Sequence, residues 1–445
     1  MTYLSEKQSP FFLFALCLPL IVSTIDLMAV SIAIHPIMQQ LSLSLSAAQW
    51  IMSAYTIGNA AFVISIGKFA DVYGRRTIFC TGIVIFMAAS LIGACSHTIL
   101  TLIIARFLQG IACATLLMSS IAIITSHYSK EARGSVISKW GLAISLGMIC
   151  GPFVGGVIIM VSNWQMIFWV NIPICFVSLL LANMMIPTEK QIAQKNTINY
   201  VSISLLSIAL ISLLYTLTLL QNKSNGIFLL ITSFILSIAF CIAFIFYDTS
   251  SKNPLIAFSL FKISQFIKPA LSGFISYFCM YGWLTIIGIY LQKNLGMTAF
   301  QAGAWCLFFS LGFACSTKLN IVILRRWSSE TLLTLGWTVM TTDILMMYFN
   351  RTNHFLSLMS ALFFLLGIGI GMTNTGSMTS ALKPITPNQS GVASGILFTI
   401  RWIGGAVGVV FAATLFALDG LSAAYLGLFL TCVAGVPLLR VRPTF

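Results

Sequence analysis

Charged residues are scarce in this chain, and acidic residues are the scarcest of them. Only 7% of the 445 residues are charged, with nine Asp or Glu against 23 Lys or Arg. A water-soluble domain needs more surface charge than this, so the composition excludes a soluble enzyme or binding module. Hydrophobic residues make up 59% of the chain and the mean hydropathy is +1.00, which predicts a polytopic all-α membrane protein.

Catalytic and nucleotide-binding patterns are also missing. The sequence holds no His-Glu-x-x-His, no Gly-x-Ser-x-Gly and no Gly-x-x-x-x-Gly-Lys-Ser/Thr phosphate loop. Its 11 Cys residues stand singly without a Cys-x-x-Cys pair, as small buried apolar side chains do. We therefore expect no enzymatic activity, no metal and no cofactor. A membrane sensor is the other class to weigh, but no polar segment is long enough for a soluble signalling domain.

The net charge of +14 would suggest nucleic acid binding in a soluble protein, yet here the bases lie in short loops between apolar runs. Fourteen runs are long enough to cross about 30 Å of hydrocarbon. They lie at 11–34, 48–67, 77–96, 98–125, 136–161, 165–186, 199–220, 227–247, 267–291, 302–323, 331–349, 355–380, 391–416 and 422–440. With both termini in the cytoplasm, eighteen bases fall inside, three outside and two within spans, as the positive-inside rule requires.

A repeat divides the chain into domains. The basic pattern of residues 67–76 returns at 317–326, which fits a duplicated six-helix bundle with the substrate near the membrane midplane between the halves. We expect residues 1–190 to form one bundle and residues 263–445 the other. Residues 191–262 are then an insert of two helices with their flanking loops.

The first copy of this pattern reads Gly67-Lys68-Phe69-Ala70-Asp71-Val72-Tyr73-Gly74-Arg75-Arg76. A basic reverse turn with Gly74 at the bend would explain it without any function. Its spacing also resembles the Gly-x-Leu-Ala-Asp-Arg-x-Gly-Arg-Arg motif between the second and third helices of the major facilitator superfamily of secondary transporters. That resemblance implies that Gly67, Asp71, Gly74, Arg75 and Arg76 form a cytoplasmic gate, and that the fold is two six-helix bundles plus two central helices.

Two charged residues lie at equal depth inside the first and fourth spans. Asp26 and Arg106 are each about eight residues from the outer end of their helix, or roughly 12 Å below the outer surface. A carboxylate at this depth is costly and is usually functional, as a proton carrier or a substrate contact. The two residues can pair, and a proton on Asp26 would weaken that pair; a static structural pair is the alternative.

Small residues on the fifth span predict close helix packing. Gly147, Gly151 and Gly155 recur every four residues, with Pro152 and Gly156 beside them. Packing alone would account for these glycines, and Pro152 would permit a bend. The pattern Gly-x-x-x-Gly-Pro-x-x-Gly-Gly also resembles the motif of the superfamily's antiporters, which implies export.

Three further side chains are candidates for the site. Asp343 is a second intramembrane acid, with either a role in proton coupling or a local partner. Arg401, near mid-membrane, would attract an anionic substrate group or balance an acid. His35 lies near a span end, where an interfacial role competes with a substrate contact or charge balance.

The stretches Trp164 to Pro173 and Arg401 to Gly408 resemble the fourteen-helix drug:proton antiporter branch. This resemblance implies a proton-coupled exporter of small amphipathic compounds or drugs, driven by the proton gradient, in the inner membrane of a bacterium. A dedicated metabolite or siderophore exporter is the alternative within transport. The implied partners are a small-molecule substrate, protons and the lipid bilayer, with no nucleic acid. A periplasmic adaptor and an outer-membrane channel are the candidate protein partners.

Overall fold

The computed structural model describes residues 10–128, 130–187, 199–219, 227–251, 254–256, 258–350, 356–385 and 390–439, and nearly all of these are helical. The first half contains α1 (Pro10–Gln40), α2 (Leu45–Tyr73), α3 (Arg75–Ala94), α4 (Ile99–His127), α5 (Lys130–Val161) and α6 (Gln165–Met185). Next come α7 (Tyr200–Leu219), α8 (Ile227–Ser250) and the short helix η1 (Phe258–Lys262). The second half contains α9 (Ser264–Ile289), η2 (Tyr290–Asn294), α10 (Ala299–Arg326), α11 (Ser329–Asn350), α12 (Leu356–Leu382), α13 (Ser390–Gly435) and η4 (Val436–Leu439).

Local sequence signals explain where several helices begin. Ser44 and Thr98 cap α2 and α4, because each side-chain oxygen accepts a hydrogen bond from a backbone N–H three residues later, at 3.3 Å in both cases. Thr298 and Gln301 form a capping box at the start of α10. Gly74 has φ +93°, a conformation that favours glycine, and it separates α2 from α3.

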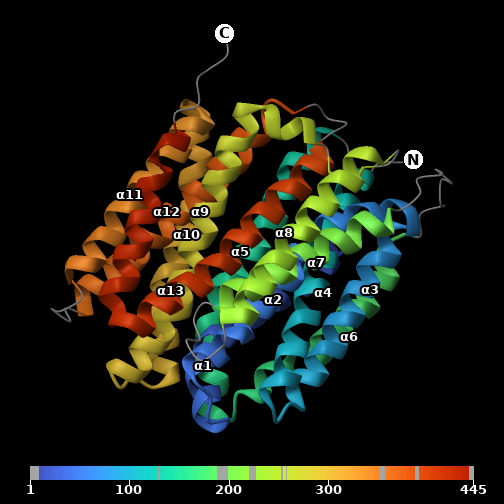
Figure 1. Ribbon diagram of the computed structural model, residues 1–445. Coiled ribbons are helices and arrows are strands. Elements are labelled where there is room, and N and C mark those ends of the chain that lie inside the picture. Colours follow the sequence, from blue (N-terminus) through green and yellow to red (C-terminus); the bar gives the residue numbers. More distant parts are fainter. Residues whose placement is uncertain are drawn as a thin grey trace.

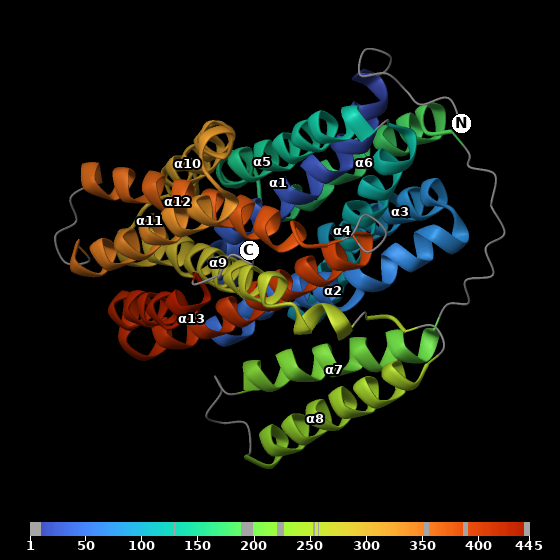
Figure 2. The same ribbon diagram turned by 90° about the horizontal axis from the view of Figure 1, so that it is seen from above.

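The helices form two groups with a pair beside them. Figure 2 shows α1–α6 on one side and α9–α13 on the other, with α7 and α8 at one edge next to α2. The two groups meet where α1 packs on α9, α2 on α13 and α5 on α10. Ring contacts and a hydrogen bond hold α7 against α2: the Trp50 and Tyr215 rings are 5.7 Å apart, and Ser207 Oγ donates to Ala61 O at 3.2 Å.

Twelve helices in the described part of the chain are long and apolar enough to cross a membrane. This is two fewer than the fourteen expected runs, for two reasons. Within α7 the described residues Tyr200–Leu213 form a shorter apolar helix, and α13, which covers both runs expected at 391–416 and 422–440, is counted as one span although it is interrupted at Asp419 and Gly420.

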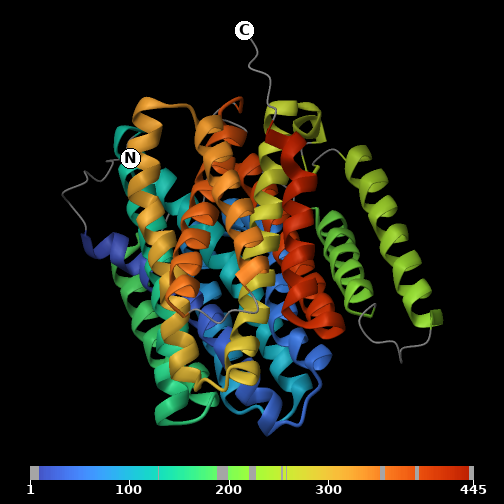
Figure 3. The same ribbon diagram turned by 90° about the vertical axis from the view of Figure 1, so that its left-hand side faces the viewer.

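The long α13 is interrupted at one point. Asp419 and Gly420 have non-helical dihedral angles, and Gly420 has φ +59°. A side chain at Gly427 would press on Leu415 and Phe411, so the segments before and after the interruption lie against each other. Figures 1 and 3 show α13 turning back at this point.

The bundle of helices has two ends, which we call the Gly74 end and the Gln40 end. The Gly74 end carries the α2–α3 turn, and the Gln40 end carries the end of α1 and the start of α2. The halves are joined toward the Gln40 end, where Gln292 Nε2 donates to Ile32 O at 3.0 Å and Ser310 Oγ donates to Met148 O at 3.1 Å. At the Gly74 end, α13 approaches α2 where a side chain on Gly395 would come within 3.8 Å of Ile64 Cα.

Candidate functional site

The structure brings Asp26 and Arg106 together. Both side chains are completely buried, Asp26 in the middle of α1 and Arg106 on α4. Arg106 Nη1 donates to Asp26 Oδ2 at 2.5 Å. Moving a carboxylate or a guanidinium from water into the protein interior costs several kcal/mol. Deleting one partner of a buried pair destabilises a protein by about 3–5 kcal/mol, because the other charge stays buried without compensation. Each charge is therefore tolerated at this depth because the other is present.

Three uncharged side chains complete the surroundings of Asp26. Asn171 Nδ2 and Gln109 Nε2 donate to Asp26 Oδ1 at 2.7 and 3.3 Å. The same two amides donate to Ser90 Oγ, at 3.3 and 3.0 Å. We call Asp26, Ser90, Arg106, Gln109 and Asn171 the polar node. It draws side chains from α1, α3, α4 and α6, so a change in the charge of Asp26 alters contacts on four helices.

Arg106 makes contacts both inside and outside the node. Its Nη1 also donates to Gln109 Oε1 at 2.7 Å, and its Nε donates to Ile51 O on α2 at 3.3 Å. The guanidinium lies 4.6 Å from the centre of the Tyr55 ring on α2, and Nη2 has no hydrogen-bond partner among the described residues. A cation over the face of a ring is attracted to it, so the Tyr55 ring is a second contact for the charge of Arg106.

The sequence did not predict Ser90, Asn171 or Tyr55 as residues of the site. Asn171 stands inside an apolar run, which was the available signal, because a polar amide at such a position needs a partner. Ser90 and Tyr55 gave no such signal. Serines occur throughout these helices, and many of them simply donate to a backbone carbonyl of their own helix, as Ser23 and Ser31 do.

The glycines of α5 face two helices. A side chain at Gly147, Gly151 or Gly155 would collide with α1, the last of these 2.7 Å from Ala29 Cα. Gly156 faces α10 instead, where a side chain would lie 2.9 Å from Phe300 Cα. The residues of α1 that these glycines touch are Ile21, Thr24, Ile25, Met28 and Ala29, which flank Asp26 on its own helix.

Pro152 is part of the same contact. A side chain at Gly303 of α10 would collide with the Pro152 carbonyl, and the Phe153 and Phe300 rings are 5.7 Å apart. α5 is therefore packed between the helix that carries Asp26 and a helix of the other group.

The residues of the expected gate are spread over several contacts. Arg76 Nη2 donates to Asn183 O at 2.8 Å and to Asn183 Oδ1 at 3.2 Å on α6. No described atom lies within 4 Å of a side chain built at Gly67. The side chain of Asp71 lies outside the described part of the structure. Arg75 is the first residue of α3.

The segment after α8 reaches the same end of α2. Lys68 Nζ donates to Pro254 O, and the Tyr73 and Tyr200 hydroxyls are 2.5 Å apart. The carboxylate of Asp248 is buried and accepts from the backbone N–H groups of Leu255 and Ile256 at 2.7 and 3.0 Å. These contacts join α2 to the inserted pair and to the chain that leads into α9.

Asp343, Arg401 and His35 lie apart from the node. Asp343 on α11 is 2% exposed, and neither carboxylate oxygen has a hydrogen-bond partner among the described residues. Arg401 is 2% exposed, donates to Asn374 and Ser377 of α12, and is also in contact with the neutral Tyr277 side chain of α9. His35 is half-buried near the end of α1.

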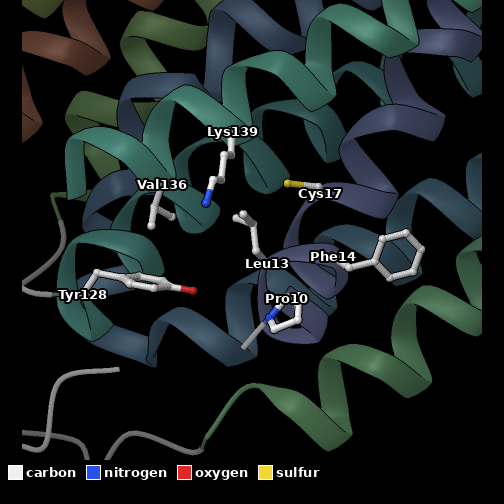
Figure 4. Close-up of a pocket in the computed structure, with 7 residues that line it drawn as sticks. All are labelled: Pro10, Leu13, Phe14, Cys17, Tyr128, Val136 and Lys139. Atoms are coloured by element: carbon white, nitrogen blue, oxygen red, sulfur yellow. The ribbon is translucent and has the colours of Figure 1, made fainter. Parts of the chain in front are cut away.

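A cavity of about 280 Å³ lies at the Gly74 end between α1, α4 and α5 (Figure 4). It contains none of the expected site residues. Its lining is Pro10, Leu13, Phe14, Cys17, Tyr128, Val136 and Lys139. In the described part of the chain, no three His, Cys, Asp or Glu side chains are grouped so that they could hold a metal ion.

These features define a membrane transport protein rather than an enzyme: a bundle of apolar helices in two groups, with an ion pair buried among four helices. The chain belongs to the Major Facilitator Superfamily, whose family model matches residues 16–409. It is similar to the methylenomycin A resistance protein of Bacillus subtilis, with 26% identity over 89% of this chain and 85% of the relative. It is also similar to the riboflavin transporter RibZ of Clostridioides difficile, with 24% identity over 92% of this chain and 89% of the relative.

The fold is also shared with a solved structure. The human organic anion transporter MFSD10 (TETRAN) superposes with a TM-score of 0.65 over 97% of this chain and 98% of that one, at 16% sequence identity. At this identity the likeness establishes the fold alone.

Proposed function

We propose that the protein is a proton-coupled antiporter that exports small amphipathic compounds from the bacterial cytoplasm by alternating access. The observation that carries this proposal is the polar node. It holds a buried carboxylate, Asp26, whose counter-charge is the single guanidinium of Arg106, and this guanidinium also contacts the Tyr55 ring. A proton added to Asp26 removes the negative charge that holds Arg106, which weakens the strongest contact between α1 and α4.

The packing supports a route from this protonation to helix movement. Residues on both sides of Asp26 lie against α5, and α5 in turn lies against α10 of the other group. A shift of α1 therefore bears directly on the contact between the two halves. In the proposed cycle, deprotonated Asp26 admits substrate from the cytoplasm, then takes a proton from outside and releases the substrate there.

The topology is part of the proposal. We propose fourteen spans. α13 turns back at Asp419 and Gly420 and so contains two of them. α7 runs along the length of α2, because Tyr200 contacts Tyr73 at one end of α2 and Tyr215 contacts Trp50 at the other. The distribution of Lys and Arg supports cytoplasmic termini, a cytoplasmic Gly74 end and a location in the inner membrane.

Residues 67–76 are proposed as the cytoplasmic gate that holds the outward-facing state. A periplasmic adaptor with an outer-membrane channel remains the candidate protein partner.

A dedicated metabolite exporter is the second candidate, favoured by the similarity to a riboflavin transporter. Both candidates share the coupling mechanism and differ in the breadth of substrates. A growth or efflux panel of chemically unrelated compounds separates them, since a dedicated exporter responds to one structural class.

The test of the proposal uses everted membrane vesicles that hold the wild-type protein, Asp26→Asn or Asp343→Asn. After a proton gradient is established, candidate substrates are added and the loss of the gradient is recorded. We expect dissipation with the wild type and none with Asp26→Asn. Equal dissipation by wild type and Asp26→Asn would show that Asp26 does not couple the proton. If only Asp343→Asn failed to dissipate the gradient, coupling would belong to Asp343.

A further inference from the structure

Arg401 is a buried cation without a buried anion. Its Nη2 donates to Asn374 O at 2.9 Å and to Ser377 Oγ at 2.6 Å, and both acceptors are neutral. Its Nη1 is 3.9 Å from the thioether sulfur of Met378, a weak acceptor, and its Nε has no hydrogen-bond partner in the part of the chain that the structure describes. Among the described residues, no carboxylate pairs with this guanidinium.

This situation differs from that of Arg106, which is equally buried but is compensated by Asp26. Burial of an unpaired charge is costly, and a guanidinium that keeps free N–H groups at the same time is costlier still. A bound anion would supply both the missing counter-charge and the missing hydrogen-bond acceptors of Arg401. No described acid of the chain supplies them in this structure.

Aromatic rings cover the space beside Arg401. Its guanidinium lies 5.7 Å from the centre of the Tyr277 ring. The Tyr277 ring is 5.9 Å from Trp402 and 5.7 Å from Tyr281, and Trp402 is 6.2 Å from Tyr55. We call Tyr55, Tyr277, Tyr281 and Trp402 the aromatic bridge.

The aromatic bridge connects the two halves of the molecule. Tyr55 belongs to α2 and lies against Arg106, whereas the other three rings belong to α9 and α13, and the Tyr277 ring among them lies against Arg401. Trp402 Nε1 is buried and has no hydrogen-bond partner within the described ranges, so the bridge also offers an unused donor there. A compound placed here would contact flat apolar surfaces, one free indole N–H and one unpaired guanidinium.

We infer that the substrates are aromatic compounds that carry one acidic group, with the acid bound by Arg401 and the ring system held by the aromatic bridge. This inference rests on the proposed export function and names its substrate class. A carboxylate or sulfonate accepts charge-assisted hydrogen bonds from Nε and Nη1, which are worth more than bonds between neutral groups. Flat rings pack on Tyr and Trp side chains with little loss of conformational freedom.

Glycine at position 273 makes this placement possible. A side chain at Gly273 on α9 would lie 2.8 Å from Arg401 Nε, the atom that has no partner. Because residue 273 has no side chain, the guanidinium packs directly against α9, next to Tyr277.

The test is an equilibrium binding experiment on the full-length protein in lipid nanodiscs, without a proton gradient. Three probes share one ring system and differ in charge: 1-naphthoate, neutral 1-naphthamide and cationic 1-naphthylmethylammonium. For the wild type we expect naphthoate to bind about tenfold to a hundredfold more tightly than the amide, the range typical of a hydrogen bond to a charged group. Arg401→Gln should abolish this preference, and Arg401→Lys should reduce it because the Nε donor is lost.

Lys318→Gln is the matched control, since it removes one exposed positive charge on α10 and should leave the preference unchanged. Equal binding of naphthoate and naphthamide to the wild type, or an unchanged preference in Arg401→Gln, would overturn the inference. If Arg401→Gln does not give folded protein, Arg401→Lys decides, and an unchanged preference in that variant would overturn it.

The outcome is separable from that of the export proposal. Dissipation of the proton gradient by naphthylmethylammonium, with no preference for naphthoate in binding, would retain antiport and reject the anionic substrate. Arg401-dependent binding of naphthoate, with no response of the proton gradient to any compound, would retain the anionic substrate and reject proton coupling.

Discussion

Asp26 accepts hydrogen bonds from three side chains on two other helices, and the contribution of each can be measured separately. The Arg106 guanidinium supplies charge, whereas Asn171 and Gln109 supply neutral N–H groups to the other oxygen. We therefore make separate predictions for the charged pair, tested through the free energy of unfolding, and for the neutral donor Asn171, tested through the transport rate.

The first residue-scale prediction concerns the ion pair. Asp26→Asn leaves a buried guanidinium without its counter-charge and should lower the free energy of unfolding by about 3–5 kcal/mol. The double variant Asp26→Asn/Arg106→Gln should lose less than the sum of the two single variants, because neither charge is left alone. Denaturant unfolding in detergent micelles, followed by circular dichroism, measures this coupling.

A surface pair provides the control for this cycle. Lys383 Nζ and Glu330 Oε1 are 3.2 Å apart, but both side chains are partly exposed, and the Lys383 side chain is 67% exposed. The corresponding cycle at this pair should give a coupling of only about 0–1 kcal/mol. Equal coupling at the two pairs would contradict the account of Asp26 and Arg106 as a desolvated pair.

The second prediction concerns Asn171, which the sequence analysis did not assign to the site. Asn171→Ala should slow proton-coupled transport about tenfold, because it removes a hydrogen bond to a charged oxygen worth about 1.5–3 kcal/mol. Asn163→Ala, at an exposed position just before the same helix, should leave the rate unchanged. Wild-type rates in Asn171→Ala, measured as gradient dissipation in everted vesicles, would remove Asn171 from the mechanism.

At the scale of helices, α5 packs between the helix that carries Asp26 and α10 of the second half. Gly151→Ala should reduce both thermal stability and transport, because its methyl group would meet Met28 Cβ and lie 2.9 Å from Ile25 O. Gly141→Ala on the same helix is the matched control: no described atom lies within 4 Å of the added carbon. It should be neutral or stabilising by up to about 1 kcal/mol, the difference in helix propensity between Gly and Ala.

The measurement for this pair is the thermal unfolding midpoint together with the transport rate. A Gly151→Ala variant as active as Gly141→Ala would show that α1 and α5 have room to separate, and the proposed route from Asp26 to α10 would then fail.

The helices and the central ion pair were predictable from sequence, whereas the rest of the node was not. Apolar runs locate helices because only a helix satisfies its own backbone in lipid, and a rise of about 1.5 Å per residue placed Asp26 and Arg106 at one depth. The partners Ser90 and Asn171 depend on which face of α3 and α6 turns inward. Helices that are apolar on all sides carry little information about that face.

The break in α13 was predictable in position. Two apolar runs were expected on either side of residues 417–421, and α13 is interrupted within this gap, at Asp419 and Gly420. An Asp-Gly pair is a common turn signal, because both residues tolerate the dihedral angles that a turn requires. The gate motif 67–76 shows a second limit: its turn at Gly74 was predictable, but its contacts with Asn183 and Pro254 involve segments far along the chain.

At the scale of the molecule, the proposed alternating-access cycle requires the contacts at the Gln40 end to open. Ile32 Cδ1 lies 3.7 Å from the position of a side-chain carbon at Gly288, so Ile32→Cys/Gly288→Cys places two thiols across the α1–α9 contact. Oxidation of this variant should stop transport, and reduction should restore it. The two single variants, treated with the same oxidant, are the controls. Full transport with the cross-link formed would show that α1 and α9 do not separate in the cycle.

The measurement that tests the central claim most directly compares two modes of transport in proteoliposomes containing wild type or Asp26→Asn. One is exchange of labelled for unlabelled substrate without any proton gradient; the other is uphill accumulation driven by an imposed gradient. If Asp26 couples the proton to the substrate, the wild type will accumulate substrate in response to the gradient, whereas Asp26→Asn, which cannot take up or release a proton at this position, will not. Gradient-driven accumulation by Asp26→Asn at the wild-type level would contradict the account.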